Sequence, residues 1–367
     1  MSLQEEIDQA RSEIHTDGYA MSIGEWISIY EKEELEIHSE FQLSFRWSTH
    51  QKSRLIESVL LGIPISQVFV AQRPDGVWDV VDGLQRLCTI FEFVGILRDE
   101  NGAVLPALTL DGTTYLPGLA GVRWQDDEQP DKSLTNAQRL LIKRTKIDVI
   151  IILQEGNIQA KPELFQRLNT GGSPLSQQEM RSSLLAMLNR DLFQWIKKLS
   201  ADQHFLDCIG LSDRMSEEQY EVELVLRFLV FRTLPLAEIA NRGDISDFLT
   251  EQAKAIARNE TFARESEEQA FRQTFELLSK VLNGDSFRRF DKAGNRFLGG
   301  FSTSAFDVIA LGIGYNYEQL VATPEIILSR IKAIWSTAEF TENSGAGINA
   351  SRRILKLISL GRKHFVA

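Results

Sequence analysis

The residues best placed to do chemistry lie in one short stretch, Asp82-Gly83-Leu84-Gln85-Arg86. An apolar, strand-like segment runs directly into this stretch, and a helical pattern of apolar residues follows it. The first amides of a helix have no partner within the helix and carry partial positive charge, so this arrangement predicts an anion site. Gly83 permits close backbone approach, Arg86 offers a planar fork to phosphate oxygens, and Asp82 can hold a metal ion, a ribose hydroxyl or water.

The same residues also fit a purely structural interpretation. Asp82 and Gln85 have the spacing of a capping box, in which Asp82 is the N-cap and the side chain of Gln85 returns to the backbone. Arg86 is then an ordinary solvated residue of the helix. The spacing alone leaves both interpretations open.

A second polar stretch, Asn169-Thr170-Gly171-Gly172-Ser173-Pro174, can close over a ligand, because its side chains offer hydrogen bonds and its glycines expose backbone amides. A turn between two helices would use the same glycines and proline equally well. Directly after it, Ser176 and Glu179 have capping-box spacing. This spacing favours Glu179 as a helix cap rather than as a catalytic acid.

The N-terminal part of the chain must position the first stretch, and its patterns are mixed α and β. Periodic apolar residues predict a helix over Thr49–Leu61. Two strands, Gln67–Gln72 and Val77–Val81, are joined by a Pro-Asp-Gly turn. A helix over Leu84–Leu97 and a central strand over Ile147–Leu153 complete the expected elements.

From about Lys161 the pattern becomes helical, and the helix that begins at Ser176 is expected to run towards Lys198. Further helices are expected over residues 217–232, 245–258, 265–282, 303–315, 324–335 and 350–360. The predicted fold class is therefore α+β. An α/β domain over residues 1–160 is followed by an all-α helical domain over residues 161–367.

The composition is that of a globular protein, with 43% hydrophobic residues, 25% charged residues and a net charge of -11. Non-specific DNA binding needs dense Lys and Arg, so this charge argues against a chain that coats nucleic acid, although it allows a local basic surface. The compact basic clusters are Arg288-Arg289, Arg352-Arg353 and Arg362-Lys363-His364. Each is either a DNA contact or a solvated face.

Several other chemistries have no pattern in this sequence. The five histidines are scattered, no Walker A motif is present, and the two cysteines lack metal or disulfide spacing. No stretch approaches the roughly 20 apolar residues that span a bilayer, and the acidic N-terminus is unlike a signal peptide. We therefore expect a cytoplasmic protein with no membrane segment and no metal site built from its own ligands alone.

Four motifs resemble, in the same order, those of the prokaryotic DUF262 family. Val80-Val81-Asp82-Gly83-Leu84-Gln85-Arg86-Leu87 resembles the family's DGQQR motif at the end of a strand. Residues 41–47 (FQLSFRW) resemble its FQR-x-(Y/F)-x-W segment, and residues 55–65 resemble the helix and proline turn after it. Residues 165–176, with Glu179 and Arg181, resemble its F-x-x-(L/I)-N-T-G-G-x-x-L-(S/T) segment. With the helical second half, the resemblance covers most of the chain.

The resemblance implies a ParB/sulfiredoxin-like N-terminal fold that binds a nucleoside triphosphate and, in some members, hydrolyses it. Mg²⁺, positioned by Asp82, is the cofactor expected with the nucleotide. Carried over by position, Asp82 and Arg86 are the active-site pair. The nucleotide-binding residues are then Gly83, Gln85, Gln42, Arg46, Asn169, Thr170, Gly171 and Gly172. Leu84 and Leu43 replace a Gln and an Arg of the family pattern, so we expect binding with slow hydrolysis at most.

Members of the family occur in anti-phage defence and modified-DNA restriction, such as the GmrSD enzymes and SspE-like proteins. The first hypothesis is therefore an NTP-binding regulator, at most a slow NTPase, that acts beside a separately encoded effector. The alternatives are a non-enzymatic module that recognises DNA or modified DNA, and a helical protein–protein scaffold. No HNH nuclease pattern follows His204, so nuclease activity is not expected in this chain. A homodimer is one possibility for its assembly.

Overall fold

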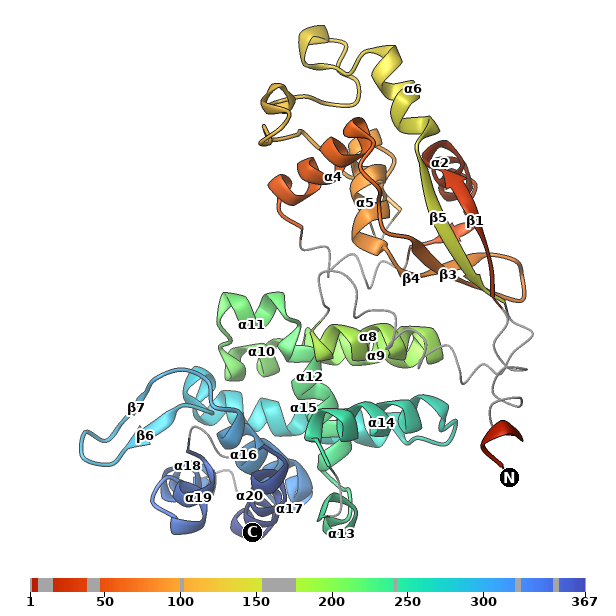
Figure 1. Ribbon diagram of the computed structural model, residues 1–367. Helices are drawn as coiled ribbons and strands as arrows, with labels where there is room; N and C mark the ends of the chain where they lie inside the picture. The colour runs from red at the N-terminus through yellow and green to blue at the C-terminus, as the bar shows by residue number, and fades with distance from the viewer. Residues whose placement is uncertain are drawn as a thin grey trace. The chain divides into compact units, whose positions relative to one another are not determined.

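The computed structural model describes residues 2–5, 16–37, 47–99, 102–153, 176–240, 243–320, 325–345 and 350–366. The chain divides into two compact units, Met1–Pro174 and Leu175–Ala367 (Figure 1). The first unit combines a sheet with helices and the second is almost entirely helical, so the predicted α+β class is confirmed. The domain boundary expected between residues 160 and 161 lies within 154–175, outside the described residues.

A five-stranded sheet forms the centre of the first unit, in the order β1-β5-β3-β4-β2. The middle strand, β3, runs parallel to β5 and antiparallel to β4, while β1 and β2 form the edges. The strands are β1 Thr16–Ser22, β2 Leu35–Glu36, β3 Val68–Gln72, β4 Trp78–Asp82 and β5 Lys146–Ile152. The predictions for β3, β4 and β5 are therefore confirmed to within one residue at each end.

The longer helices of this unit are α2 Ile23–Glu31, α4 Thr49–Leu61, α5 Leu84–Val94 and α6 Asn136–Arg144. The prediction for α4 is confirmed at both ends, because Ser48 caps its start and Gly62, with a φ of 71°, ends it. Helix α5 ends earlier than the predicted Leu97. Its last turn closes at Gly95, which has a φ of 84° and donates its N–H to the carbonyls of Phe91 and Glu92.

The second unit is a helical assembly that also contains a small β-hairpin, which the sequence did not predict. Its helices are α8 Gln177–Leu188, α9 Arg190–Ser200, α10 Gln203–Ile209, α11 Asp213–Glu217, α12 Tyr220–Phe231, α13 Leu236–Ala240, α14 Ile245–Arg258, α15 Arg264–Val281, α16 Thr303–Tyr315, α17 Tyr317–Leu320, α18 Glu325–Ile334, α19 Ala338–Asn343 and α20 Ala350–His364. The hairpin strands are β6 Arg289–Asp291 and β7 Arg296–Leu298.

The single helix expected from Ser176 towards Lys198 is wrong. The chain leaves helical geometry at Asn189, which has a φ of -158° and a ψ of 92°. The Asn189 side chain then accepts the N–H of Leu192 at 2.9 Å and caps α9. A capping residue inside a continuous apolar period therefore divides the segment into α8 and α9.

Aromatic side chains and close helix contacts make the core of the second unit. Phe205, Phe271 and Phe275 are fully buried and their rings contact one another, with centroids 4.6–5.2 Å apart. Helices α16 and α20 approach so closely that a Cβ on Gly312 would lie 2.5 Å from the carbonyl oxygen of Gly361. A Cβ on Gly361 would in turn collide with the carbonyl of Val308 on α16. Glycine is thus required where these two helices cross.

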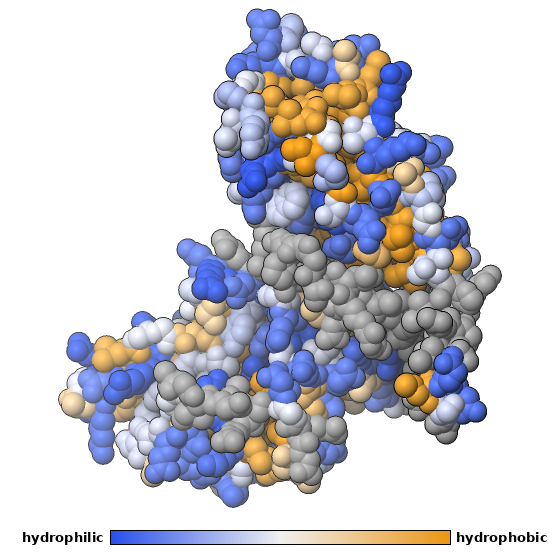
Figure 2. Space-filling view, viewed as in Figure 1, coloured by the Kyte–Doolittle hydropathy of each residue, from blue (hydrophilic) through white to orange (hydrophobic). Residues whose placement is uncertain are grey.

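Apolar side chains also reach the surface of the first unit (Figure 2). Leu61 at the end of α4 and Leu140 and Leu141 on α6 are exposed by 45%, 39% and 48%.

Among the residues that the structure describes, no helix has both the length and the apolar character needed to cross a membrane.

The crossing of α16 and α20 gives a first prediction. Gly361→Ala should lower the free energy of unfolding by about 1–3 kcal/mol, because its methyl group would overlap the backbone of α16. Urea denaturation followed by circular dichroism measures this change. Gly243→Ala is the control, since a Cβ there meets nothing within 4 Å. Equal stabilities of the two variants would contradict the prediction.

Candidate functional site

The turn between β4 and α5 has a geometry that only glycine satisfies. Gly83 has a φ of 98°, in the left-handed region that side chains disfavour. A Cβ at this position would lie 2.8 Å from Cγ2 of Val68 and 3.1 Å from Nη2 of Arg86. Backbone conformation and packing therefore both exclude a larger residue here.

Asp82 and Arg86 contact each other across this turn. Nη2 of Arg86 lies 3.1 Å from Oδ2 of Asp82 and donates a further hydrogen bond of 3.0 Å to the carbonyl of Gln67. The Arg86 side chain is only 13% exposed and that of Asp82 is 28% exposed. The interpretation of Arg86 as a solvated helix residue is therefore wrong.

The capping-box interpretation of Asp82 is also wrong. The N-cap of α5 is Gly83, and no side chain caps this helix. The Asp82 carboxylate accepts from Arg86 instead, and Gly83, with its positive φ, occupies the N-cap. The N-terminus of α5 thus lies beside an arginine and offers backbone N–H groups that no capping side chain occupies.

The predicted site residues fall into two groups. Asp82, Gly83 and Arg86 are brought together, with Gln85 in the first turn of α5. The Nε atom of Arg86 is buried and has no hydrogen-bond partner among the described residues. The other predicted nucleotide-binding residues lie outside the described residues: Gln42, Arg46, Asn169, Thr170, Gly171 and Gly172.

Helix α4, which packs against α5, contains a buried carboxylate that sequence reasoning missed. Oε1 of Glu57 accepts the N–H groups of Tyr115 and Leu116, each at 3.0 Å, and the hydroxyl of Thr113. These hydrogen bonds, chiefly the one from Thr113, hold the pKa of Glu57 below its usual value. Glu57 therefore anchors a loop to α4. The sequence does hold a signal for this burial, because Glu57 directly follows Ile56, a residue of the apolar stripe of the helix.

Helices α4 and α5 are also joined by charge. Nζ of Lys52 lies 2.6 Å from Oε2 of Glu92, and the two side chains are 12% and 16% exposed. A pair this well shielded is less screened by salt than a surface pair. This ion pair therefore holds α5, the helix that carries Arg86, against α4.

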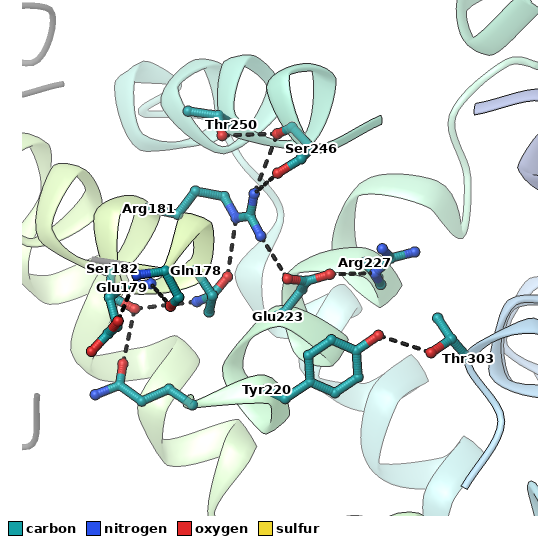
Figure 3. Close-up of polar contacts among 12 residues, drawn as sticks. Gln178, Glu179, Arg181, Ser182, Tyr220, Glu223, Arg227, Ser246, Thr250 and Thr303 are labelled. Carbon is teal, nitrogen blue, oxygen red and sulfur yellow. Dashed lines mark hydrogen bonds and ion pairs between the residues drawn. The ribbon is translucent and has the colours of Figure 1, made fainter. Parts of the chain in front are cut away.

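A second polar group of the second unit, which we term the Arg181 cluster, consists of the buried residues Gln178, Arg181 and Arg227 with the half-buried Glu223 and Ser246 (Figure 3). Arg181 is 1% exposed and donates to Gln178 at 3.0 Å, Ser246 at 2.6 Å and Glu223 at 2.7 Å. These contacts tie α8 to α12 and α14. The partners went unpredicted, although Glu223 and Arg227 have the i,i+4 spacing of an ion pair within an apolar helix.

The charges around this cluster compensate one another. Arg227 donates to Glu223 at 2.9 Å and lies 3.4 Å from Oδ1 of Asp307. Burial raises the pKa of Asp307 and lowers the pKa of Arg181, while the opposite charge beside each group resists the shift. Two guanidinium groups and two carboxylates therefore form a satisfied internal network. Such a network holds helices together rather than performing a reaction.

The capping role predicted for Glu179 is confirmed. Its Oε2 accepts the N–H of Ser176 at 2.7 Å, and the Ser176 hydroxyl accepts the N–H of Glu179 at 3.2 Å. The last residue of the 165–176 motif is thus the N-cap of α8.

Neither cysteine is a candidate nucleophile. Cys88 and Cys208 are both buried and free. Burial raises the pKa of each thiol, that of Cys208 to about 12, so both stay protonated at neutral pH. Within the described ranges, no group of three or more His, Cys, Asp and Glu side chains could hold a metal ion.

The fold and the turn define an α+β protein whose strand–turn–helix sets an Arg–Asp pair beside a helix N-terminus without a capping side chain. Residues 26–186 match the family model of the GmrSD restriction endonuclease, N-terminal domain. Residues 26–186 therefore form a domain of the GmrSD N-terminal, DUF262 type, which confirms the predicted family. The match extends into α8 and includes Arg181. No curated protein and no solved structure matches the chain.

Gly83→Ala tests the turn. We expect it to lower the free energy of unfolding by about 2 kcal/mol or more, because it combines a left-handed backbone with a clash against Val68. Gly62→Ala is the matched control, since Gly62 has a φ of 71° but nothing within 4 Å of an added Cβ. Chemical denaturation should show a larger loss for Gly83→Ala. A loss no greater than that of the control would show that the contact with Val68 is unimportant.

Arg181→Ala tests the buried cluster. Removal of the buried guanidinium leaves the largely shielded carboxylate of Glu223 with fewer partners, so we expect a loss of about 2–4 kcal/mol in unfolding free energy. Arg214→Ala serves for comparison, because its side chain is 85% exposed and its pair with Glu218 is on the surface. Thermal and urea denaturation measure both changes. Similar small effects of the two substitutions would refute the structural role of Arg181.

Proposed function

We propose that this chain binds a nucleoside triphosphate with Mg²⁺ at the Asp82–Arg86 turn, within a prokaryotic restriction or anti-phage defence system and beside a separately encoded effector. The observation that carries the proposal is the ion pair of 3.1 Å between Asp82 and Arg86 at an N-terminus without a capping side chain. Structural capping does not explain these residues, since the carboxylate does not cap the helix. The GmrSD N-terminal domain supplies the biological setting.

The turn offers two kinds of phosphate donor. Backbone N–H groups at the start of α5 carry partial positive charge and point out of the helix, as in other anion sites at helix termini. Arg86 adds a full charge, and its contacts with Asp82 and the Gln67 carbonyl fix the plane of its guanidinium. A guanidinium that is already held loses less conformational freedom when a ligand binds.

The donor set at the turn fits Mg²⁺ bound together with a nucleotide. Mg²⁺ is usually held by one or two carboxylates, several waters and the oxygens of substrate phosphates. Asp82 supplies one partly exposed carboxylate, and its Oδ1 has no partner among the described residues. Asp82 would therefore hold the ion through this oxygen. When bound, Mg²⁺ would neutralise charge on the phosphates.

Binding is favoured over turnover because of Leu84. The side chain of Leu84 packs against the apolar core of the first unit, where the family motif has a polar Gln. It cannot donate a hydrogen bond to a phosphate or orient a water molecule. We therefore expect the chain to hold the nucleotide and to hydrolyse it slowly at most.

Calorimetric titration of the four NTPs with Mg²⁺ into the full chain tests the proposal. At least one nucleotide should bind, and Arg86→Ala should weaken its affinity roughly 10- to 100-fold, the effect of losing hydrogen bonds to a charged group. Asp82→Asn should weaken binding with Mg²⁺ more than binding without it, because only the carboxylate attracts the ion.

Arg73→Ala is the matched control. Arg73 also pairs with an aspartate on the same sheet, Asp79, with Nη2 and Oδ1 2.5 Å apart, but it lies at the opposite end of the β3–β4 hairpin from Gly83. The Arg73→Ala variant should bind nucleotide with the same affinity as the wild type. No heat with any nucleotide would reject the proposed function, and binding that survives Arg86→Ala would place the site elsewhere.

A further inference from the structure

The β6–β7 hairpin projects from the helices of the second unit (Figure 1). Arg289 lies opposite Leu298, Phe290 opposite Phe297, and Asp291 opposite Arg296. Side chains alternate between the two faces of a strand, so Arg289 and Arg296 share one face and the two phenylalanines share the other. The hairpin takes part in neither the Asp82–Arg86 turn nor the Arg181 cluster.

The charge of the hairpin is opposite to that of the whole chain. Residues 286–298 contain four cations, Arg288, Arg289, Lys292 and Arg296, and one carboxylate, Asp291. The segment therefore carries a net charge of +3 in a chain of net charge -11.

Three of these cations are available to a partner. Arg289, Lys292 and Arg296 are exposed, and their side chains make no hydrogen bond or ion pair within the described residues. Arg288, in contrast, pairs with Asp285 at 3.1 Å. The Asp291 carboxylate accepts the N–H groups of Ala293 and Gly294, each at 3.2 Å, and so stabilises the turn rather than neutralising an arginine.

The hairpin is braced, although isolated two-stranded hairpins are only marginally stable. The rings of Phe290 and Phe297 have centroids 5.1 Å apart. Lys332 on α18 lies 4.9 Å from the centroid of the Phe290 ring and donates to Oδ1 of Asn295 at 3.2 Å. At the base, Nε of Arg288 donates to the carbonyl of Gly299 at 2.6 Å. The three cations are therefore presented by an ordered element.

A hollow of about 310 Å³ lies at the base of the hairpin. Gly284, Gly299 and Gly300 form part of its wall, with Arg288 beside them. Glycines leave the backbone uncovered, which lets another chain approach closely.

We propose that the β6–β7 hairpin is a nucleic-acid contact surface that binds the phosphate backbone of a DNA duplex through Arg289, Lys292 and Arg296. A two-stranded ribbon is narrow enough to enter the major groove, and cations beside it meet a dense row of phosphates. The acidic remainder of the chain would repel DNA, so contact is confined to this projection. The inference goes beyond the proposed nucleotide site, because it concerns other residues in the other unit.

Fluorescence anisotropy with a short labelled DNA duplex tests the proposal on the full chain, over about 50–200 mM salt. The wild type should bind with a marked salt dependence. The triple variant Arg289→Gln, Lys292→Gln, Arg296→Gln should reduce the slope of log K against log salt by about 2.7, or 0.9 for each lost phosphate contact. Its affinity near 0.1 M salt should fall on the order of 100-fold.

The control is a second triple variant with the same loss of charge, Arg190→Gln, Arg258→Gln, Lys356→Gln, at exposed helix positions of the same unit. It should bind DNA as the wild type does. Arg289→Lys with Arg296→Lys keeps the charge and should retain most of the affinity. Circular dichroism should show that the hairpin variants fold, since the side chains of the three hairpin cations have no hydrogen-bond or ion-pair partner within the described residues, and it checks the fold of the control variant in the same way.

Two outcomes would overturn the proposal: no DNA binding by the wild type, or an equal loss in both triple variants. Equal affinity for polyglutamate at the same salt concentration would assign the hairpin to acidic polypeptides instead. Nucleotide binding by the hairpin variant should be unchanged, so failure of this proposal leaves the Asp82–Arg86 site intact, and the reverse also holds.

Discussion

The close approach of Gly83 to Val68 is the constraint on which the candidate site depends. A backbone with a φ of 98° turns the chain from β4 into α5 with no room for a side chain. The same turn brings Arg86 to Asp82 and to the Gln67 carbonyl, so the Asp82 carboxylate pairs with the guanidinium and makes no cap hydrogen bond to α5. One glycine therefore sets both the position of the cation and the availability of the helix N-terminus.

Charged side chains have two different roles in the second unit. In the Arg181 cluster, each guanidinium is buried and matched by a carboxylate, so the charges stabilise the packing of helices and stay hidden from solvent. On the β6–β7 hairpin, Arg289 and Arg296 are exposed, and the Asp291 carboxylate accepts hydrogen bonds from the turn. Burial with compensation is typical of a structural role, whereas exposure without compensation is typical of a surface that meets an anionic partner.

The sequence predicted the elements with a strong hydrophobic period, including Thr303–Tyr315 and Ile245–Arg258, which the structure confirms at both ends. It also predicted that Asp82, Gly83 and Arg86 act together, because a strand, a glycine and a helix follow one another there. It left open a capping box of Asp82 with Gln85 and an anion site that uses Asp82 and Arg86, and only the structure, in which Gly83 is the N-cap, decides against the cap. The break at Asn189 comes from a capping residue that the continuous apolar period concealed, and the partners of Arg181 lie 42 and 65 residues away along the chain.

The central claim is that the Asp82–Arg86 turn holds the phosphates of a nucleotide. A crystal structure of the full chain with Mg²⁺ and a non-hydrolysable triphosphate analogue tests it most directly. We predict phosphate oxygens within hydrogen-bonding distance of the Arg86 guanidinium and of the first backbone N–H groups of α5, with the ion on Asp82. An analogue bound elsewhere, with the 3.1 Å pair between Asp82 and Arg86 untouched and no phosphate near α5, would contradict the account.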